Sequence, residues 1–363
     1  MRNSWIFVGH LLPGQTSLMR MNALRRCDVD VTGFDTRSIW NTQTWLQRQM
    51  STRLERGPAI DGINKGLIDV ARDVRPTHIW FDKQEFIRPD TLDELKRLGA
   101  CLVYYTPDPY FTLVWKRTRL MDACLTRFDL LVTSKSYECR HFASVGPPYL
   151  YLPLGYCDEV HRPIRVDSCE RASLGFVGGW EPRRQSILEA IAAQGVALKI
   201  WGYAWDHLVD GKWTLRRYLR LRRLAGGTGE WKVARSESLS NSFVSGEVYA
   251  DDYARALSTS GINIGFLRTI CDDQHTTRSF EIPACGSMML ADRTDEHQAF
   301  FEEGKEAEYF ASEEELIEKA IFYARNETSR RRIATAGLDR CRRSGYSYRD
   351  RMRAVLQRLG TLS

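Results

Sequence analysis

The side chains with the clearest capacity for chemistry in this sequence are arginines at points where an apolar run gives way to a helix-like segment. Arg278 follows a polar loop and opens such a segment. A planar guanidinium at this position is suited to bind a phosphate group through two parallel hydrogen bonds. Thr276 and Thr277 offer hydroxyl and N–H groups to the same anion. The alternative is an ion pair between Arg278 and Glu281, one helical turn later.

A second candidate phosphate-binding segment lies near residue 180. Gly178 and Gly179 follow an apolar run, and glycine lets the backbone approach a ligand closely, although the same pair also suits an ordinary turn. Arg183 and Arg184 come just inside the helix that we expect next. Cations at the start of a helix oppose its dipole, so a bound anion is one reason to find them there. Tyr203 is a candidate for stacking on a base, or an ordinary core residue.

Acid–base chemistry has three candidates in the first half of the chain. His10, Asp82 and Asp108 each follow an apolar, strand-like run. If a hydroxyl group has to be deprotonated, a carboxylate or imidazole at the tip of a strand is the group to do it. Asp108 leads, because Pro107 and Pro109 fix its loop. Each of the three can equally be a polar surface residue.

A framework for these residues follows from the hydrophobic pattern. Short apolar or β-branched runs alternate with helix-length segments, which is typical of parallel sheets covered by helices on both faces. In the first half we expect strands at residues 5–8, 29–34, 78–81, 102–105, 130–133 and 149–152. In the second half we expect strands at 174–177, 198–201, 262–266 and 288–291, with helices at 185–193, 253–258, 280–285 and 313–326.

The alternation predicts two α/β domains, each a doubly wound, Rossmann-like sheet, facing each other across a cleft where ligands bind at the carboxyl ends of the strands. Residues 1–160 form the first domain and residues 170–345 the second, with a Pro- and Gly-containing linker between them. Residues 346–363 contain an amphipathic helix, which we expect to pack back onto the first domain. Residues 203–246 show no clear strand.

Composition narrows the classes of protein. The chain has 363 residues, 43% of them hydrophobic and 27% charged, as in soluble globular proteins. Its nine cysteines are scattered singly, which predicts a cytoplasmic protein without a metal site. The net charge of +6 allows nucleic acid, an anionic membrane surface or a phosphorylated small molecule as partner. The basic run Arg216–Arg223 suits contact with a membrane or nucleic acid, or a solvated helix face.

The segment Thr277–Gly304 resembles a known protein family. It contains TRSFEIPACG, then LADR, then FEEG, and is similar to the R-x-F-E-x-x-A-C-G signature of the CgeB-like (spore maturation protein) glycosyltransferases. These are bacterial relatives of the group 1, or family 4, enzymes with the GT-B fold. Residues 176–179 with Arg183 and Arg184, and residues 200–202, resemble the family's elements at the start of its C-terminal domain.

The resemblance implies roles for particular residues. Glu281 matches the second glutamate of the family's E-x7-E pattern, which accepts hydrogen bonds from the ribose hydroxyls of the donor. Asp273 stands where the family has the first glutamate, near the donor sugar, and its shorter side chain leaves a catalytic role open. The loop with Gly14 and Gln15 is implied to face donor phosphates and acceptor, with helix capping by Thr16 or Ser17 as the alternative.

We therefore expect a glycosyltransferase that moves a sugar from a nucleoside-diphosphate donor to a polysaccharide, lipid or protein acceptor, with no metal or other cofactor. Transfer with retained configuration, as in family 4, would need no base. A DNA-modifying glycosyltransferase or nucleic-acid binder stays open on charge, although no aromatic-rich binding face is evident. A non-catalytic protein that binds sugar nucleotides stays open because of Asp273.

Overall fold

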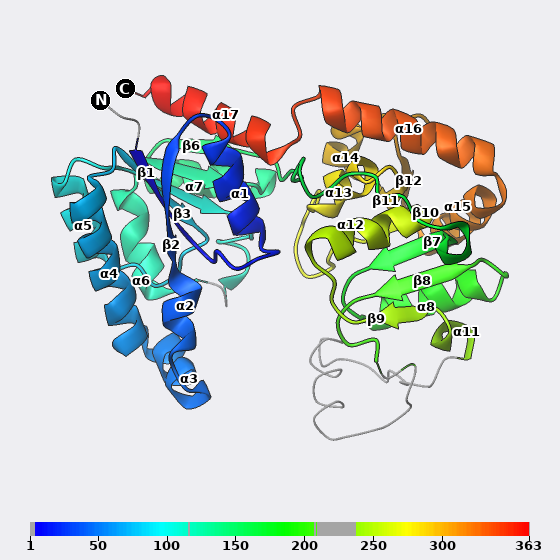
Figure 1. The fold of residues 1–363 in the computed structure, drawn as a ribbon, viewed down its shortest axis with the longest axis horizontal. Coiled ribbons are helices and arrows are strands. Elements are labelled where there is room, and N and C mark those ends of the chain that lie inside the picture. Colours follow the sequence, from blue (N-terminus) through cyan, green and yellow to red (C-terminus); the bar gives the residue numbers. More distant parts are fainter. Residues whose placement is uncertain (1–3, 115–116, 207, 209–236, 363) are drawn as a thin grey trace. The chain divides into compact units, whose positions relative to one another are not determined.

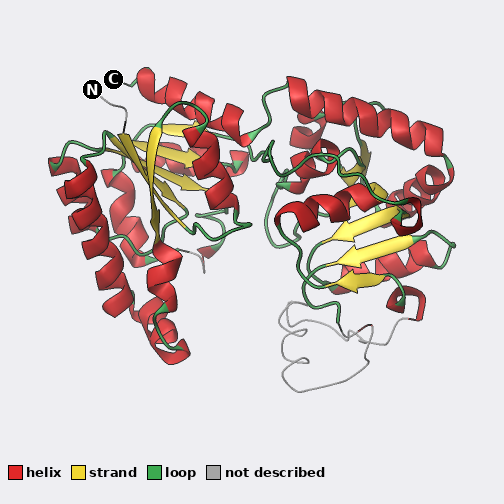
Figure 2. Cartoon of the chain, in the orientation of Figure 1, coloured by secondary structure: helices red, strands yellow, loops and turns green. Residues whose placement is uncertain are grey.

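The computed structural model describes residues 4–114, 117–206, 208 and 237–362 (Figure 1). The predicted basic run Arg216–Arg223 therefore lies outside the described residues. The chain forms two compact units. The first consists of Met1–Cys157, Arg268–Asp273 and Ser347–Ser363, and the second of Asp158–Leu267 and Gln274–Tyr346. Each unit is an α/β structure with one central sheet (Figure 2).

The sheet of the first unit has six parallel strands in the order β2-β1-β3-β4-β5-β6. The strands are β1 (Ser4–Gly9), β2 (Asp30–Asp35), β3 (His78–Asp82), β4 (Cys101–Thr106), β5 (Leu130–Thr133) and β6 (Tyr149–Tyr151). The helices are α1 (Thr16–Arg25), α2 (Thr36–Asn41), α3 (Trp45–Leu54), α4 (Pro58–Val74), α5 (Pro89–Arg97), α6 (Arg119–Cys124), α7 (Cys139–Val145) and α17 (Tyr348–Gly360). Ile6 and Val8 pack with Ile63 and Leu67 of α4 in one core cluster.

The sheet of the second unit also has six parallel strands, in the order β12-β11-β10-β7-β8-β9. They are β7 (Ala172–Val177), β8 (Leu198–Trp201), β9 (Phe243–Ser245), β10 (Ser260–Gly265), β11 (Met288–Asp292) and β12 (Glu308–Phe310). The helices are α8 (Pro182–Ala192), α11 (Glu237–Ser240), α12 (Ala250–Thr259), α13 (Arg278–Ala284), α14 (Asp295–Phe300), α15 (Glu313–Arg325) and α16 (Glu327–Arg343). The predicted doubly wound α/β class is confirmed, and every strand expected from the sequence is present.

Five elements of the second unit were not predicted: the strands β9 and β12 and the helices α11, α14 and α16. The strands β9 and β12 are three-residue edge strands, too short to give a periodic signal. The expectation that residues 203–246 contain no strand is wrong at β9. The helix α16 was missed because only Ile333, Ala334, Gly337 and Cys341 of its seventeen residues are buried, which leaves little apolar periodicity. None of the described helices combines the length and apolar character needed to cross a bilayer.

The chain returns to the first unit at its C-terminal end. Helix α17 packs against α1 (Figure 1). The Tyr348 amide donates to the Tyr156 carbonyl at 2.7 Å, and the Arg351 guanidinium donates to the Leu154 carbonyl at 3.2 Å. The segment Arg268–Asp273, which follows β10, also belongs to the first unit, a feature that the predicted division at residues 160–170 did not include.

Candidate functional site

The predicted donor-binding residues of the second unit gather at the carboxyl edge of its sheet. Gly178 and Gly179 follow β7, Tyr203 follows the adjacent strand β8, and the loop that leads to α13 follows β10 on the other side of β7. The β7 and β8 ends approach closely, because a Cβ added to Gly202 would lie 2.1 Å from the Gly178 carbonyl oxygen. Gly202 therefore has a packing function whether or not a ligand binds here, and so does Gly178, where an added Cβ would lie 2.7 Å from the Phe176 ring, whereas Gly179 has room for a side chain.

Arg278 is anchored at this edge by one atom of its guanidinium. Its Nε donates to the Val177 carbonyl at the end of β7, at 2.8 Å. The side chain is half-buried. Within the described part of the chain no carboxylate forms an ion pair with Arg278, and the expected alternative partner, Glu281, is bonded to Tyr253 instead. Arg278 therefore presents a fixed positive charge whose Nη groups have no acidic partner among these residues.

Glu281 lies on α13 as predicted, but its carboxylate is buried. Oε2 accepts a hydrogen bond from the Tyr253 hydroxyl at 2.6 Å, and Oε1 lies 3.8 Å from Nε2 of His161. Burial, together with the Glu281 charge, raises the pKa of Tyr253 far above its usual value. Burial lowers the pKa of His161, although Glu281 opposes this shift, so His161 is neutral at pH 7. Ribose binding by Glu281 remains a prediction, and a ribose hydroxyl would have to share or replace the Tyr253 contact.

A buried polar network fixes the loop before α13. Nδ1 of His297 donates to the Asp292 carbonyl at 2.6 Å. Because this nitrogen carries the proton, Nε2 accepts the Ser279 hydroxyl at 2.7 Å, and Ser279 Oγ in turn accepts from the Thr276 amide at 3.0 Å. Burial lowers the pKa of His297 to about 4, which keeps the imidazole neutral. Sequence reasoning missed His297, since no motif links it to Ser279.

The two arginines at the start of α8 have carboxylate partners within the second unit. Arg183 Nε lies 2.9 Å from Glu313. Arg184 Nη2 lies 3.0 Å from Glu181, and its Nη1 donates to the Gly179 carbonyl at 2.9 Å. Their position at a helix start is thus explained by acidic neighbours and requires no anionic ligand. Their contact with a diphosphate remains a prediction.

Asp273, the candidate near the donor sugar, is engaged by residues of the first unit. Its Oδ1 lies 2.5 Å from Lys135 Nζ and accepts from the Tyr137 hydroxyl at 3.1 Å. The Lys135 and Asp273 side chains are both nearly buried. The carboxylate is therefore neutralised where it lies, and a catalytic role would require it to act from within this ion pair.

Asp82, one of the three base candidates, is fully buried. Both of its oxygens accept hydrogen bonds from Arg20 at 2.7 Å, and Oδ1 also accepts from Ser17 at 2.6 Å. Burial disfavours the charged carboxylate, but the Arg20 guanidinium and the hydrogen bonds from Ser17 and Trp80 outweigh it and lower the pKa of Asp82. Asp82 is an internal ion-pair partner, so the hypothesis that it is a base is wrong.

The remaining candidates of the first unit lie at the carboxyl edge of their sheet. Asp108 forms an ion pair with Lys83. His10 lines a cavity of ≈ 250 Å³ that Lys83 and Arg37 also line. Partial burial and the Arg37 charge lower the pKa of His10, so its imidazole is neutral and able to accept a proton at pH 7.

The loop that was predicted to face the donor precedes α1. Gly14 adopts a positive φ of 81°, which favours glycine. Gln15 occupies the N-cap position of α1 without a side-chain capping bond. Ser17 donates its hydroxyl to Asp82 and does not cap the helix. The alternative explanation of this segment as a side-chain helix cap is therefore wrong for Ser17.

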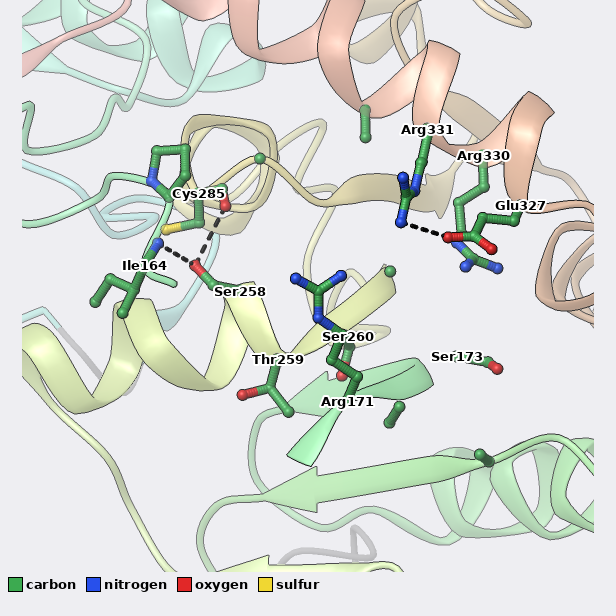
Figure 3. Close-up of a pocket in the computed structure, with 16 residues that line it drawn as sticks. Ile164, Arg171, Ser173, Ser258, Thr259, Ser260, Cys285, Glu327, Arg330 and Arg331 are labelled. Atoms are coloured by element: carbon green, nitrogen blue, oxygen red, sulfur yellow. Dashed lines mark hydrogen bonds and ion pairs between the residues drawn. The ribbon is translucent and has the colours of Figure 1, made fainter. Parts of the chain in front are cut away.

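A cavity of ≈ 430 Å³ lies at the opposite, amino edge of the second sheet (Figure 3). It is lined by the starts of β7 and β10 and by the first turns of α16. Figure 3 shows the Arg171 side chain directed into the cavity and Arg331 paired with Glu327. None of the predicted site residues lines it. Among the described residues no cluster of three or more His, Cys, Asp or Glu side chains is arranged to hold a metal ion.

Comparison with known proteins places this geometry in context. Residues 183–357 match the model of a family described as glycosyl transferase-like. A solved glycosyltransferase from Rickettsia africae superposes with a TM-score of 0.61 at 12% identity, covering 99% of this chain and 98% of that one. Anabaena Alr3699/HepE, solved with UDP and glucose, gives 0.61 at 11% identity, covering 99% of both chains. A comparison with curated proteins finds no match.

A putative UDP-N-acetylglucosamine 2-epimerase from Listeria monocytogenes has the same fold, with a TM-score of 0.56 at 10% identity, covering 99% of this chain and 96% of that one. Identities this low show the fold alone, and one fold supports several reactions. The coverage of the whole chain by these proteins confirms the predicted GT-B fold. The chain thus has the GT-B fold and carries a glycosyl transferase-like C-terminal region.

Proposed function

We propose that this chain of GT-B fold is a CgeB-like glycosyltransferase, which moves a sugar from a nucleoside-diphosphate donor to an acceptor without a metal ion. The observation that carries the proposal is the setting of Arg278. Its guanidinium is fixed by the Val177 carbonyl at the carboxyl edge of β7 and has no acidic partner in the described chain. An uncompensated charge held at a ligand-binding edge is suited to a diphosphate.

The reaction breaks the bond between the anomeric carbon and the diphosphate oxygen and forms one to an acceptor oxygen, which loses its proton. Negative charge grows on the departing diphosphate, and the Nη groups of Arg278 compensate it. Because an arginine supplies this charge, the proposal needs no divalent cation. Thr276 and Thr277, on the loop fixed by Ser279, add hydrogen-bond donors. Glu281 binds the ribose hydroxyls, which share or replace its contact with Tyr253.

The acceptor proton has two candidate receivers. His10 is neutral and lies at the end of β1, while Asp108 lies after β4. Either serves if the configuration inverts; if it is retained, neither is required, because the departing diphosphate oxygen can take the proton. A saccharide, a lipid-linked saccharide or a protein remains the proposed acceptor. All nine cysteines are free thiols, which supports the proposed cytoplasmic location.

A non-catalytic sugar-nucleotide-binding protein is the second candidate, and the Lys135–Asp273 pair favours it. An acidic side chain locked at 2.5 Å to a lysine is poorly placed to steady a sugar cation. In this case the protein would bind the donor through Arg278 and leave it intact.

Release of nucleoside diphosphate from UDP-, GDP- and dTDP-sugars tests the proposal, measured with and without a chelator. UDP-sugars come first, because the Anabaena protein of the same fold was solved with UDP-glucose. We expect the wild type to turn over the donor with or without the chelator. Arg342→Ala, a control at an exposed arginine of α16, should behave like the wild type, and Arg278→Ala should lose turnover. Binding without turnover would favour the second candidate. Absence of both, or conversion of the donor to an epimer, would refute the transferase.

A further inference from the structure

Helix α3 of the first unit is built with its apolar side outward. Among its ten residues only Ser51 is buried, and it accepts a hydrogen bond from the Gln43 amide at 3.0 Å. Its large apolar side chains are exposed: Trp45 by 69%, Leu46 by 61%, Met50 by 52% and Leu54 by 62%. Figure 1 shows α3 at the far end of the α2–α3 arm, away from the β-sheet of its unit. This arrangement reverses the usual one, in which the apolar face of a helix covers a core.

The exposed side chains form a stripe on a well-defined helix. Leu46, Met50 and Leu54 are spaced four residues apart, so they lie on one face. Thr44 starts the helix with a capping box, in which Gln47 Oε1 accepts from the Thr44 amide at 2.8 Å. The capping box thus fixes the start of the helix that carries the stripe. An exposed apolar patch on a fixed helix is typical of a binding surface.

The C-terminal end of α3 is held as well. The Glu55 carboxylate, directly after the helix, accepts hydrogen bonds from the amides of Arg119 and Leu120 at 3.0 and 2.7 Å. Hydrogen bonds therefore hold α3 at both ends, and its apolar side chains are exposed on a fixed helix.

Positive charge dominates on the helix itself, although Asp61 and Asp90 line a cavity together with Glu55 and Arg56 beyond its end, and Asp61 is paired with Arg88. Helix α3 itself contains no Asp or Glu, while Arg48 and Arg53 lie on it and Arg56 follows it. Apolar side chains flanked by arginines match the acyl boundary and the phosphates of an anionic lipid surface. Pairing of α3 with its counterpart in a second copy would bring like charges together in a symmetric interface.

We propose that α3 docks this protein on an anionic lipid surface, with Leu46, Met50 and Leu54 entering the headgroup boundary and Arg53 and Arg56 on lipid phosphates. The docking surface lies within the first unit and does not depend on the transferase reaction. It also differs from the membrane contact expected of Arg216–Arg223, because it rests on apolar insertion.

Co-sedimentation with vesicles tests the proposal on the full chain. The vesicles are phosphatidylcholine alone, or phosphatidylcholine with phosphatidylglycerol. We expect the wild type to bind the anionic vesicles, and the triple variant Leu46→Ser/Met50→Ser/Leu54→Ser to lose at least about tenfold in affinity, since each removed side chain withdraws buried apolar surface. Arg53→Gln/Arg56→Gln should lose about fivefold or more, and only with anionic vesicles.

A matched control is Phe322→Ser, which removes a 51% exposed apolar side chain from α15 and should leave binding unchanged. The α3 variants should keep the wild-type melting temperature, because the substituted side chains make little buried contact. The proposal is overturned if the wild type binds neither kind of vesicle or if the triple variant binds as well as the wild type. It is equally overturned if the same substitutions abolish self-association in sedimentation velocity while vesicles have no effect.

Discussion

Arg20 and Arg278 lie at the carboxyl edges of the two sheets, and their surroundings differ. Arg20 is buried, donates two hydrogen bonds of 2.7 Å to Asp82, and lies over the rings of Tyr105 and Tyr348. Arg278 is half-buried and donates to a single carbonyl, that of Val177. The charge of Arg20 is neutralised by Asp82 within its own unit, whereas the charge of Arg278 has no carboxylate partner among the described residues. An arginine at the carboxyl edge of a sheet therefore indicates an anion-binding site only when it forms no ion pair with a carboxylate of the protein.

Loss of Arg20 should have the largest effect on stability. Arg20→Ala leaves the Asp82 carboxylate buried without its counter-charge, which should lower the free energy of unfolding by about 3–5 kcal/mol, as measured by urea denaturation. Arg72→Ala removes an exposed ion pair with Glu94 and should cost less than about 1 kcal/mol. The double variant Arg20→Met/Asp82→Leu should regain most of the loss. If the free energy of unfolding fell by less than about 1 kcal/mol in Arg20→Ala, Arg20 would not have the structural role that distinguishes it from Arg278.

Arg278→Ala should show the opposite profile. We expect UDP affinity to fall by about 10- to 100-fold, because charge-assisted hydrogen bonds to phosphate are lost, while the free energy of unfolding changes by about 1 kcal/mol for the single bond to Val177. Calorimetric titration and urea denaturation measure the two quantities. Arg278→Lys, which keeps the charge without the planar fork, should fall between. If Arg278→Ala lost stability but kept its affinity for UDP, Arg278 would have a structural role like that of Arg20 and would not bind the diphosphate.

The setting of Arg278 depends on a neutral His297, which predicts a pH dependence. The pKa of His297 is about 4 in the folded chain and about 6.5 when unfolded, so only the unfolded state takes up a proton between these values. Stability is therefore complete above pH 6.5 and is lost as the pH falls toward 4. Between pH 7 and pH 5 this group should cost about 2 kcal/mol.

His297→Gln isolates that contribution, since glutamine can keep one donor and one acceptor in the network. We expect the variant to lose about 2 kcal/mol less than the wild type over the same pH interval in urea denaturation. Equal pH dependence in the two proteins would show that His297 is not the group that titrates, and that the loop of Arg278 is held by other contacts.

The sequence predicted Arg278 and Glu281 because both lie in one short segment whose pattern is local. Their partners could not be predicted in the same way. Tyr253, which binds Glu281, and His161, which lies beside it, come from α12 and from the start of the second unit, and only the folded sheet brings them together. The fold was predictable because apolar periodicity extends over every long strand. The ion-pair and hydrogen-bond partner of each charged side chain was not, because it depends on tertiary contacts.

Substitution of Arg183 should have the smallest effect on UDP binding, and it tests whether an arginine with a carboxylate partner is excluded from the binding site. It lies beside the same strand ends as Arg278, yet its Nε is 2.9 Å from Glu313 in a partly exposed ion pair. Arg183→Ala should therefore change UDP affinity by less than about twofold and stability by less than about 1 kcal/mol, by the same titration and denaturation. Glu313→Gln, which frees Arg183, should strengthen UDP binding slightly if the guanidinium can reach the ligand. A loss of about tenfold in Arg183→Ala would mean that a carboxylate partner does not exclude an arginine from the site, and the distinction between paired and unpaired arginines would fail.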